Sequence, residues 1–275
     1  MKNLDICSII SDLNLVTTMV GMTIIKPLTQ LREIVSKALS GQTKSSKSFR
    51  TFFIETMELY LTNKGRINFT TMAKLGKLCE SRFRQNFKKS FDRLSFNKSF
   101  LEPMKRHRIA IAIVPCFISK SGKKTPGMDR FWSGCAAAMK KGLEILGISI
   151  VDADIKDAVF LKAEQPFTEK KRQTRKSFFC TDLKMSARDM TDLKMSARDM
   201  FDLYRTRFQI EFAFRDAKQF TGLTHCQARN KEALAFAFNM SLSSINVART
   251  YARQENINLS VGSTKTLLHN ATMVD

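Results

Sequence analysis

The sequence lacks any pair of cysteines spaced to hold zinc. Its six cysteines form no C-x-x-C pair, and none has a histidine at ligand spacing; they are Cys7, Cys79, Cys116, Cys135, Cys180 and Cys226. A small zinc module or a disulfide scaffold is therefore excluded. We expect all six thiols to be reduced and either buried or idle, which favours a cytoplasmic protein.

The sequence also lacks a convincing membrane span or signal peptide. Its best apolar stretch, residues 6–25, is interrupted by Asp12 and Asn14, so it is a poor span. Asp5 lies where a signal peptide would carry positive charge. We therefore expect no membrane association.

Acidic residues are scarce relative to basic ones. The chain has 46 Lys and Arg against 25 Asp and Glu, a formal charge of +21 and a pI of about 10.0. Such a surplus usually serves a polyanionic partner. A membrane-surface protein and a ribosomal-type RNA-binding protein are the rival classes. The cations are spread through sequence that is typical of folded protein, which favours nucleic acid as the partner.

The first part of the chain, residues 1–103, has a helical pattern. An apolar stripe follows Pro27, and a second helix is expected over residues 49–62. Two short helices follow, one over residues 68–78 and one from Ser81 to about Phe91, which predicts a helix-turn-helix-like unit. Its exposed cations would contact DNA: Arg82, Arg84 and Lys88. The alternative is a solvated basic helix that Phe83, Phe87 and Phe91 pack against the core.

The remainder, residues 104–275, predicts a mixed α/β region. Strands are expected over residues 108–114, ended by Pro115, then over 142–151 and 158–163, and from Ser177 onward. The basic loop 120–127 lies between the first two strands. It lacks the leading glycine of a phosphate loop, and Pro126 prevents a helix from starting there, so an ATPase is excluded.

Residues 204–218 carry the most informative pattern, because they predict a helix with one charged face. Steps of three and four place five side chains together: Tyr204, Arg207, Glu211, Arg215 and Lys218. The intervening apolar residues would pack the helix on a sheet. A carboxylate among cations suits a site that holds a divalent metal beside phosphate. The alternative is an exposed helix with ion pairs among Arg207, Glu211 and Arg215.

The spacing Y-x2-R-x3-E-x6-K resembles the signature of DDE transposases of bacterial insertion-sequence family four. Segments 66–70, 83–87, 121–127, 131–135, 218–223 and 225–229 resemble that family in the same order. The resemblance implies an α+β protein with a ribonuclease-H-like core behind the N-terminal helical region. It implies Mg²⁺ or Mn²⁺ as cofactor, and as partners the terminal repeats of the element, target DNA and a second copy of the chain.

The resemblance also implies roles for particular residues. Glu211 would be catalytic and bind metal. Tyr204, Arg207 and Lys218 would contact DNA, and we add Arg215 from its position on the helix. The basic loop would supply Lys120, Lys123 and Lys124.

Two of the three carboxylates of the family's metal site are missing. The first should precede a proline where this chain has Val114 and Pro115. The second should follow a helix and a strand, but the connector 166–176 is too short to contain them, which indicates a deletion. Nearby acids could substitute, namely Asp129, Asp152, Asp154 and Asp157, although acids at strand ends are ordinarily turn residues.

A perfect repeat adds to the picture of a damaged sequence. Residues 181–190 recur letter for letter as residues 191–200. Two copies do not make a repeat architecture. We therefore expect a nucleoid-associated, transposase-like protein with impaired metal-dependent cleavage and strand transfer. The alternatives are a non-enzymatic DNA-binding remnant that competes with an intact transposase and an RNA-binding structural protein.

Overall fold

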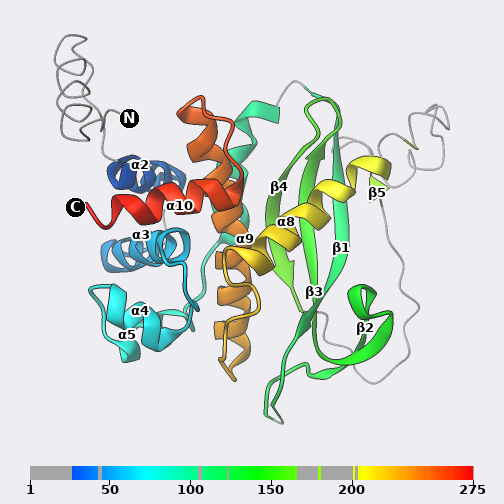
Figure 1. Ribbon diagram of the computed structural model, residues 1–275, viewed down its shortest axis with the longest axis horizontal. Helices are drawn as coiled ribbons and strands as arrows, with labels where there is room; N and C mark the ends of the chain where they lie inside the picture. The colour runs from blue at the N-terminus through cyan, green and yellow to red at the C-terminus, as the bar shows by residue number, and fades with distance from the viewer. Residues whose placement is uncertain are drawn as a thin grey trace, which may run out of the picture.

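The computed structural model describes residues 27–42, 45–104, 107–122, 124–165, 179–180, 201 and 204–274. These residues form a helical layer beside an antiparallel sheet, with one helix lying across the sheet (Figure 1). The mixed α+β class expected from the sequence is confirmed. None of the described helices combines the length and apolar content that a bilayer crossing requires.

The helical layer begins with α2 (Pro27–Ser40) and α3 (Lys47–Thr62), followed by α4 (Phe69–Leu75), α5 (Glu80–Asn86), α6 (Arg93–Lys98) and the 3₁₀ helix η1 (Ser99–Met104). Phenylalanines fill its interior: Phe52 on α3, Phe83 and Phe87 at α5, and Phe236 from the far end of the chain pack ring against ring. Such aromatic pairs contribute beyond their buried area. The predicted packing role of Phe83 and Phe87 is therefore confirmed.

The second predicted short helix is shorter than expected. We predicted it to about Phe91, but α5 ends at Asn86 and a turn follows. Phe91 still packs into the same cluster, against Phe53 and Phe96. These ring contacts hold the partly buried Phe91 against the core although the chain has left the helix.

The sheet has the strand order β2-β3-β1-β5, and β4 pairs with β3 as well. Its strands are β1 (Ile109–Ser119), β2 (Asp129–Ser133), β3 (Ala138–Asp152), β4 (Asp157–Glu164) and β5 (Phe179–Cys180), with η2 (Gly134–Ala136) between β2 and β3. All described pairings are antiparallel. The expected strands at 142–151 and 158–163 are confirmed, as is strand structure at residues 179–180.

The end predicted for the first strand was wrong. Strand β1 continues through Pro115, which lies opposite Leu146 of β3. Among the described residues, β5 pairs β1 only at Ile111 and Ala112. Proline lacks an N–H and is tolerated where a strand has no partner on one side.

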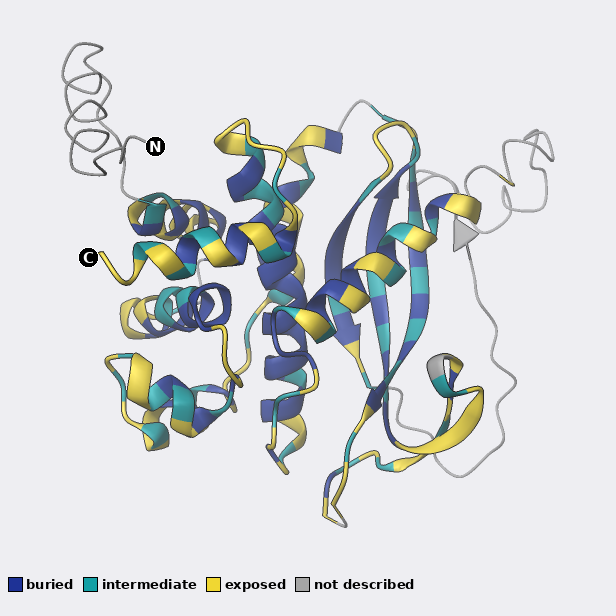
Figure 2. Ribbon diagram, viewed as in Figure 1, coloured by how far each residue is buried: buried dark blue, intermediate teal, exposed yellow. Residues whose placement is uncertain are grey.

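The C-terminal helices return to the N-terminal ones. Helix α9 (Lys231–Gln254) packs on α2, α3 and β4, and α10 (Val261–Ala271) packs on α2, α3 and α9. Figure 2 shows the resulting buried band along α9, between the helices and the sheet. The predicted boundary between an N-terminal domain (residues 1–103) and a second domain (residues 104–275) stays a prediction.

Helix α9 covers the outer edge of strand β4 with side-chain amides. Asn246 Oδ1 accepts a hydrogen bond from the backbone N–H of Phe160 (3.0 Å), and its Nδ2 donates to the Phe160 carbonyl (2.8 Å). Asn239, two turns earlier, bonds the N–H and carbonyl of Ala163 in the same way, both at 2.9 Å. An uncovered edge would offer these groups to another chain. The two asparagines thus end the sheet.

Candidate nucleic-acid interface

Helix α8 (Phe208–Gln219) holds most of the residues in the charged pattern, and residues 204–206 form a helical turn just before it. Its buried face rests on the sheet and on α9. Phe214 lies over Gly147 of β3, where an added Cβ would come within 2.4 Å of the ring. The glycine therefore allows the helix to approach the sheet closely.

The structure brings three of the predicted site residues together. Arg207 pairs with Glu211 one turn along, and its guanidinium lies 5.2 Å from the centre of the Tyr204 ring. The same guanidinium lies 5.1 Å from the Phe208 ring centre. Glu211 is thus held by a cation instead of standing free.

The second half of the predicted face is arranged differently. Arg215 binds Asp216 Oδ1 at 3.0 Å and lies over the Phe212 ring, so the expected pairing of Arg215 with Glu211 was wrong. Asp216 is a largely buried carboxylate that the sequence analysis missed. The sequence could have indicated this burial, because Asp216 follows Ala213 by three residues and therefore lies beside the apolar face of the helix. Lys218 is partly exposed near the end of the helix.

The described residues do not fit a divalent-metal site. Val114, where the resemblance predicts the first carboxylate, is buried opposite Gly147, which places it on the sheet face under α8. Its side chain offers no ligand. Among the residues that the structure describes, no group of three His, Cys, Asp or Glu could hold a metal ion.

The acids considered as substitutes are engaged by other groups of the protein. Asp152 is fully buried; it accepts hydrogen bonds from the N–H groups of Asp154 and Ile155 and contacts His107 Nδ1 at 2.6 Å. Asp154 binds Arg108, and the Arg108 N–H and side-chain hydrogen bonds lower its pKa. The remaining two bind neighbouring groups: Asp157 with Arg249 and Arg253, and Asp129 with the Arg130 N–H. The contacts of Asp152 agree with the turn interpretation, whereas Asp157 pairs with two arginines of α9.

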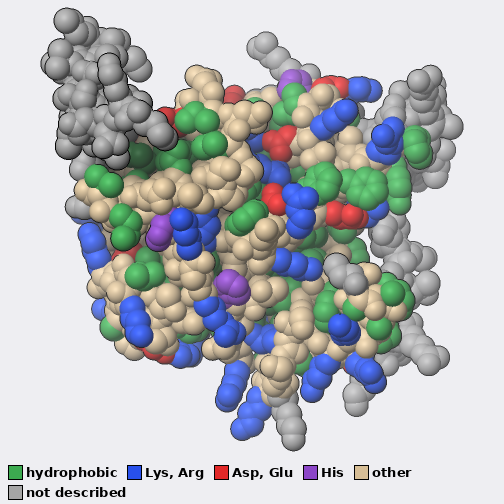
Figure 3. Space-filling model, in the orientation of Figure 1, with side chains coloured by type: hydrophobic (Ala, Val, Ile, Leu, Met, Phe, Trp, Pro, Cys, Tyr) green, Lys and Arg blue, Asp and Glu red, His purple; other side chains and the backbone are tan. Residues whose placement is uncertain are grey.

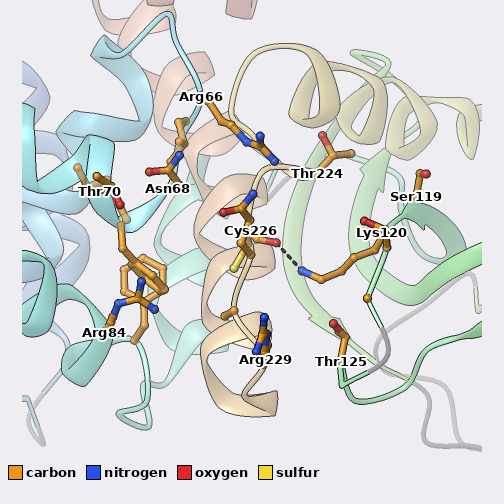
Figure 4. Close-up of a pocket in the computed structure, with 18 of the residues that line it drawn as sticks. Arg66, Asn68, Thr70, Arg84, Ser119, Lys120, Thr125, Thr224, Cys226 and Arg229 are labelled. Atoms are coloured by element: carbon orange, nitrogen blue, oxygen red, sulfur yellow. Dashed lines mark hydrogen bonds between the residues drawn. The ribbon is translucent and has the colours of Figure 1, made fainter.

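A basic cleft of about 1280 Å³ lies between the helical layer and the sheet. The helical side contributes the α3–α4 connection, α4 and α5, and the other side contributes the β1–β2 loop, β3 and the α8–α9 connection (Figure 4). Within the described lining there is no Asp or Glu, and six cations contribute: Arg66, Arg84, Lys120, Lys124, Lys141 and Arg229. Figure 3 shows Lys and Arg gathered over the lower part of this face. Such a surface attracts polyanions.

Two of the cations are held in place by local contacts. Lys120 Nζ donates to the backbone carbonyl of Cys226, which ties the β1–β2 loop to the α8–α9 connection. Burial lowers the pKa of Lys120. Arg84 pairs with Glu80 through Nε at 2.9 Å and lies 4.9 Å from the centre of the Phe69 ring. The cleft is thus built on fixed side chains from both walls.

His225 joins the two walls of the cleft. Its Nδ1 accepts a hydrogen bond from the backbone N–H of Ile67 at 3.1 Å. That bond requires an unprotonated Nδ1, and burial, reinforced by the charges of Arg66 and Lys265, lowers the pKa of the imidazole. Protonation would therefore weaken this contact between the α3–α4 and α8–α9 connections, which line the two walls of the cleft.

The cleft collects only some of the predicted DNA contacts. Arg84, Lys120 and Lys124 line it, while Arg82 and Lys88 are exposed on or just after α5 but outside the lining. Lys123 lies outside the described residues, as do the short connector 166–176 and the repeat 181–200. The sequence analysis missed three lining cations as site residues, Arg66, Lys141 and Arg229, although the first and last fall in segments that carry the resemblance.

Of the cysteines whose side chains are described, Cys79, Cys116 and Cys226 are unbridged. Cys79 is exposed, Cys116 is buried, and burial raises the pKa of the Cys226 thiol.

Comparison with known proteins finds a similarity over part of the chain. A family model described as the transposase DDE domain matches residues 158–247, which run from β4 through α8 into α9. No curated protein and no solved structure gives a significant match. The chain is therefore similar to transposase DDE domains over the segment that carries Glu211 and the α8–α9 connection of the cleft's second wall.

Proposed function

We propose that this chain is a transposase-like protein that binds DNA in the basic cleft. The observation that carries the proposal is the cleft itself, in which six cations and no described acid converge from distant segments. Neutralising phosphates with Lys and Arg releases counterions and supplies sequence-independent affinity. The match to transposase DDE domains supports DNA as the polyanion.

The position of helix α8 supports a single DNA path that runs along the cleft and then along the charged face of α8. The cleft opens beside the connection that follows α8. Glu211 lies eight residues before Gln219, or about 12 Å along the helix axis. DNA in the cleft would therefore pass within reach of Lys218 and Glu211. Arg215 lies between Lys218 and Glu211 on the helix, so the DNA would reach it as well, and Tyr204 and Arg207 would contact the DNA further along.

The proposal also covers the transposase family, the core fold, the DNA substrates and the assembly state. We infer descent from insertion-sequence family four, with a ribonuclease-H-like core, terminal repeats and target DNA as substrates, and assembly of two copies on DNA. The antiparallel order of β4, β3 and β1, with α8 across one face, supports this core.

We infer that cleavage and strand transfer are impaired. Glu211 is paired with Arg207, and buried Val114 replaces a ligand under α8. Restoring activity would require both the missing carboxylates and the missing segment. The alternative function is that of a non-enzymatic remnant that occupies the ends of an element and competes with an intact transposase.

The test combines DNA binding and cleavage in the same samples. Supercoiled plasmid that carries the gene's flanking DNA is incubated with the protein and Mg²⁺ or Mn²⁺, then analysed for gel shift and nicking. We expect a shift without nicking, and loss of the shift in Arg66→Gln/Arg229→Gln. The control is Lys37→Gln/Lys98→Gln, which removes the same charge from exposed positions outside the cleft.

Each other result has a definite meaning. Metal-dependent nicking that Glu211→Gln abolishes would refute the impairment. A shift that RNA competes away as well as the flanking DNA would favour the RNA-binding class. The absence of any shift would refute the proposed function.

A further inference from the structure

The β2–β3 hairpin forms an exposed ribbon beyond the main body of the sheet. Strand β2 pairs with the first part of β3, and the register places Trp132 opposite Met139. Both side chains are about half exposed, at 50% and 49%. Figure 2 shows the ribbon as mostly exposed residues beside the buried core strands. Large apolar side chains in such a position suggest a contact surface.

One face of the ribbon combines these apolar side chains with two cations. Residues 130 and 132 alternate with 131, so they share a face, and their cross-strand partners share it too. Arg130 lies directly opposite Lys141, next to the pair of Trp132 and Met139. Like charges opposite each other destabilise a hairpin, so this arrangement opposes the stability of the free protein. A bound anion would remove that penalty.

The ribbon face is continuous with the basic cleft. Lys141 belongs to both, because it lines the cleft and pairs with Arg130 on β2. A polyanion in the cleft would therefore reach the ribbon without leaving positive surface. An indole beside two cations matches a nucleotide, since the aromatic ring stacks on a base while the cations bind the adjacent phosphates.

We propose that the β2–β3 ribbon holds a nucleic-acid strand as it leaves the cleft, with Trp132 stacked on an unpaired base and Arg130 and Lys141 on the flanking phosphates. This rests on the proposed function, because the cleft must deliver the strand. A base inside a duplex does not expose its face for stacking, so the occupant is a single-stranded extension or a frayed end.

Trp132 is the only tryptophan in the chain, so the fluorescence of the protein reports on this side chain directly. The full chain is titrated with a labelled duplex that carries a single-stranded extension and with the blunt duplex of the same sequence. Label anisotropy measures binding, and tryptophan emission measures contact with Trp132. We expect the extended duplex to quench the emission and the blunt duplex to bind with much less quenching.

Three controls isolate base stacking. Polyglutamate, an anion without bases, should leave the emission unchanged. Trp132→Ala should weaken binding of the extended duplex by about five-fold or more, the low end of the range for one stacked base, and leave the blunt duplex unaffected. Arg130→Gln, outside the cleft lining, should weaken only the extended duplex. Because Trp132 is half exposed, circular dichroism should show an unchanged fold.

The outcomes separate this proposal from the proposed function. Binding of the extended duplex with unchanged emission would overturn the ribbon proposal and leave the cleft intact. Equal quenching by polyglutamate would overturn base stacking. No binding of either duplex would overturn both proposals.

Discussion

Replacing Asn246 should be among the most damaging single changes in the chain. This amide makes three buried hydrogen bonds: two with the backbone of Phe160 and one, at 2.9 Å, from its Nδ2 to Asn97 Oδ1. Asn246→Ala would leave one donor and two acceptors without their partner. Each such buried group costs about 1–3 kcal/mol. Water entering the space would lower the penalty, so we take the low end and expect a loss of about 3 kcal/mol.

A loss of this size is a large share of the stability of a typical domain, about 5–15 kcal/mol. It should be measured by urea denaturation followed by far-ultraviolet circular dichroism. Asn246→Asp is a second variant, which keeps the acceptor for the Phe160 N–H. It places a carboxylate oxygen against the Phe160 carbonyl and Asn97 Oδ1, which are both acceptors, so we expect it to be at least as unstable as Asn246→Ala. Asn270→Ala, on the exposed side of α10, is the matched control.

Asn246→Ala should also expose the outer edge of strand β4. Light scattering should then detect association of Asn246→Ala at concentrations where the wild type and Asn270→Ala remain monodisperse. An Asn246→Ala protein as stable as the control would refute the idea that α9 amides end the sheet.

Three further predictions concern the surroundings of the cleft and α8. Burial lowers the pKa of His225, so as the pH falls this imidazole is protonated in the unfolded chain before it is protonated in the folded protein. The free energy of unfolding should therefore fall as the pH drops below about 6.5. Denaturation measured at a series of pH values should show a weaker pH dependence in His225→Leu. Burial lowers the pKa of Lys265 to about 8, so unfolding free energy should rise between about pH 8 and 10.5, by up to about 3 kcal/mol, a rise that Lys265→Met should remove. Gly147→Ala should destabilise by about 1–3 kcal/mol through contact with the Phe214 ring, and Phe214→Leu should restore part of the loss; additive effects would argue against this contact.

The elements that the sequence predicted best are those with a strong local pattern. The apolar runs of β3 and β4 and the three-and-four spacing around Glu211 are properties of short segments, and the structure contains each element at nearly the predicted place. Arg207 and Glu211 also pair as that spacing requires, because four residues on a helix bring side chains together.

Most of the failures have a different cause, since they depend on partners far away in the chain. Strand β1 continues through Pro115 as part of its pairing with β3, and Phe91 packs on Phe53 although α5 has already ended at Asn86. The cleft places Arg66 of the α3–α4 connection with Arg229 before α9, a meeting that no local pattern contains. The contact of Arg215 with its neighbour Asp216 in place of Glu211 depends on the rotamers chosen in the folded state.

The salt dependence of DNA binding tests the cleft most directly. Dissociation constants for a short labelled duplex should be measured by anisotropy over a range of salt concentrations. If all six lining cations contact phosphates, log K should fall with log salt with a slope of about −5, and Arg66→Gln/Arg229→Gln should reduce its magnitude by about two and weaken binding at least ten-fold. The charge-matched Lys37→Gln/Lys98→Gln protein should keep the wild-type slope. Equal slopes and affinities for the two double variants would contradict the account, because DNA would then be held by net charge and not by the cleft.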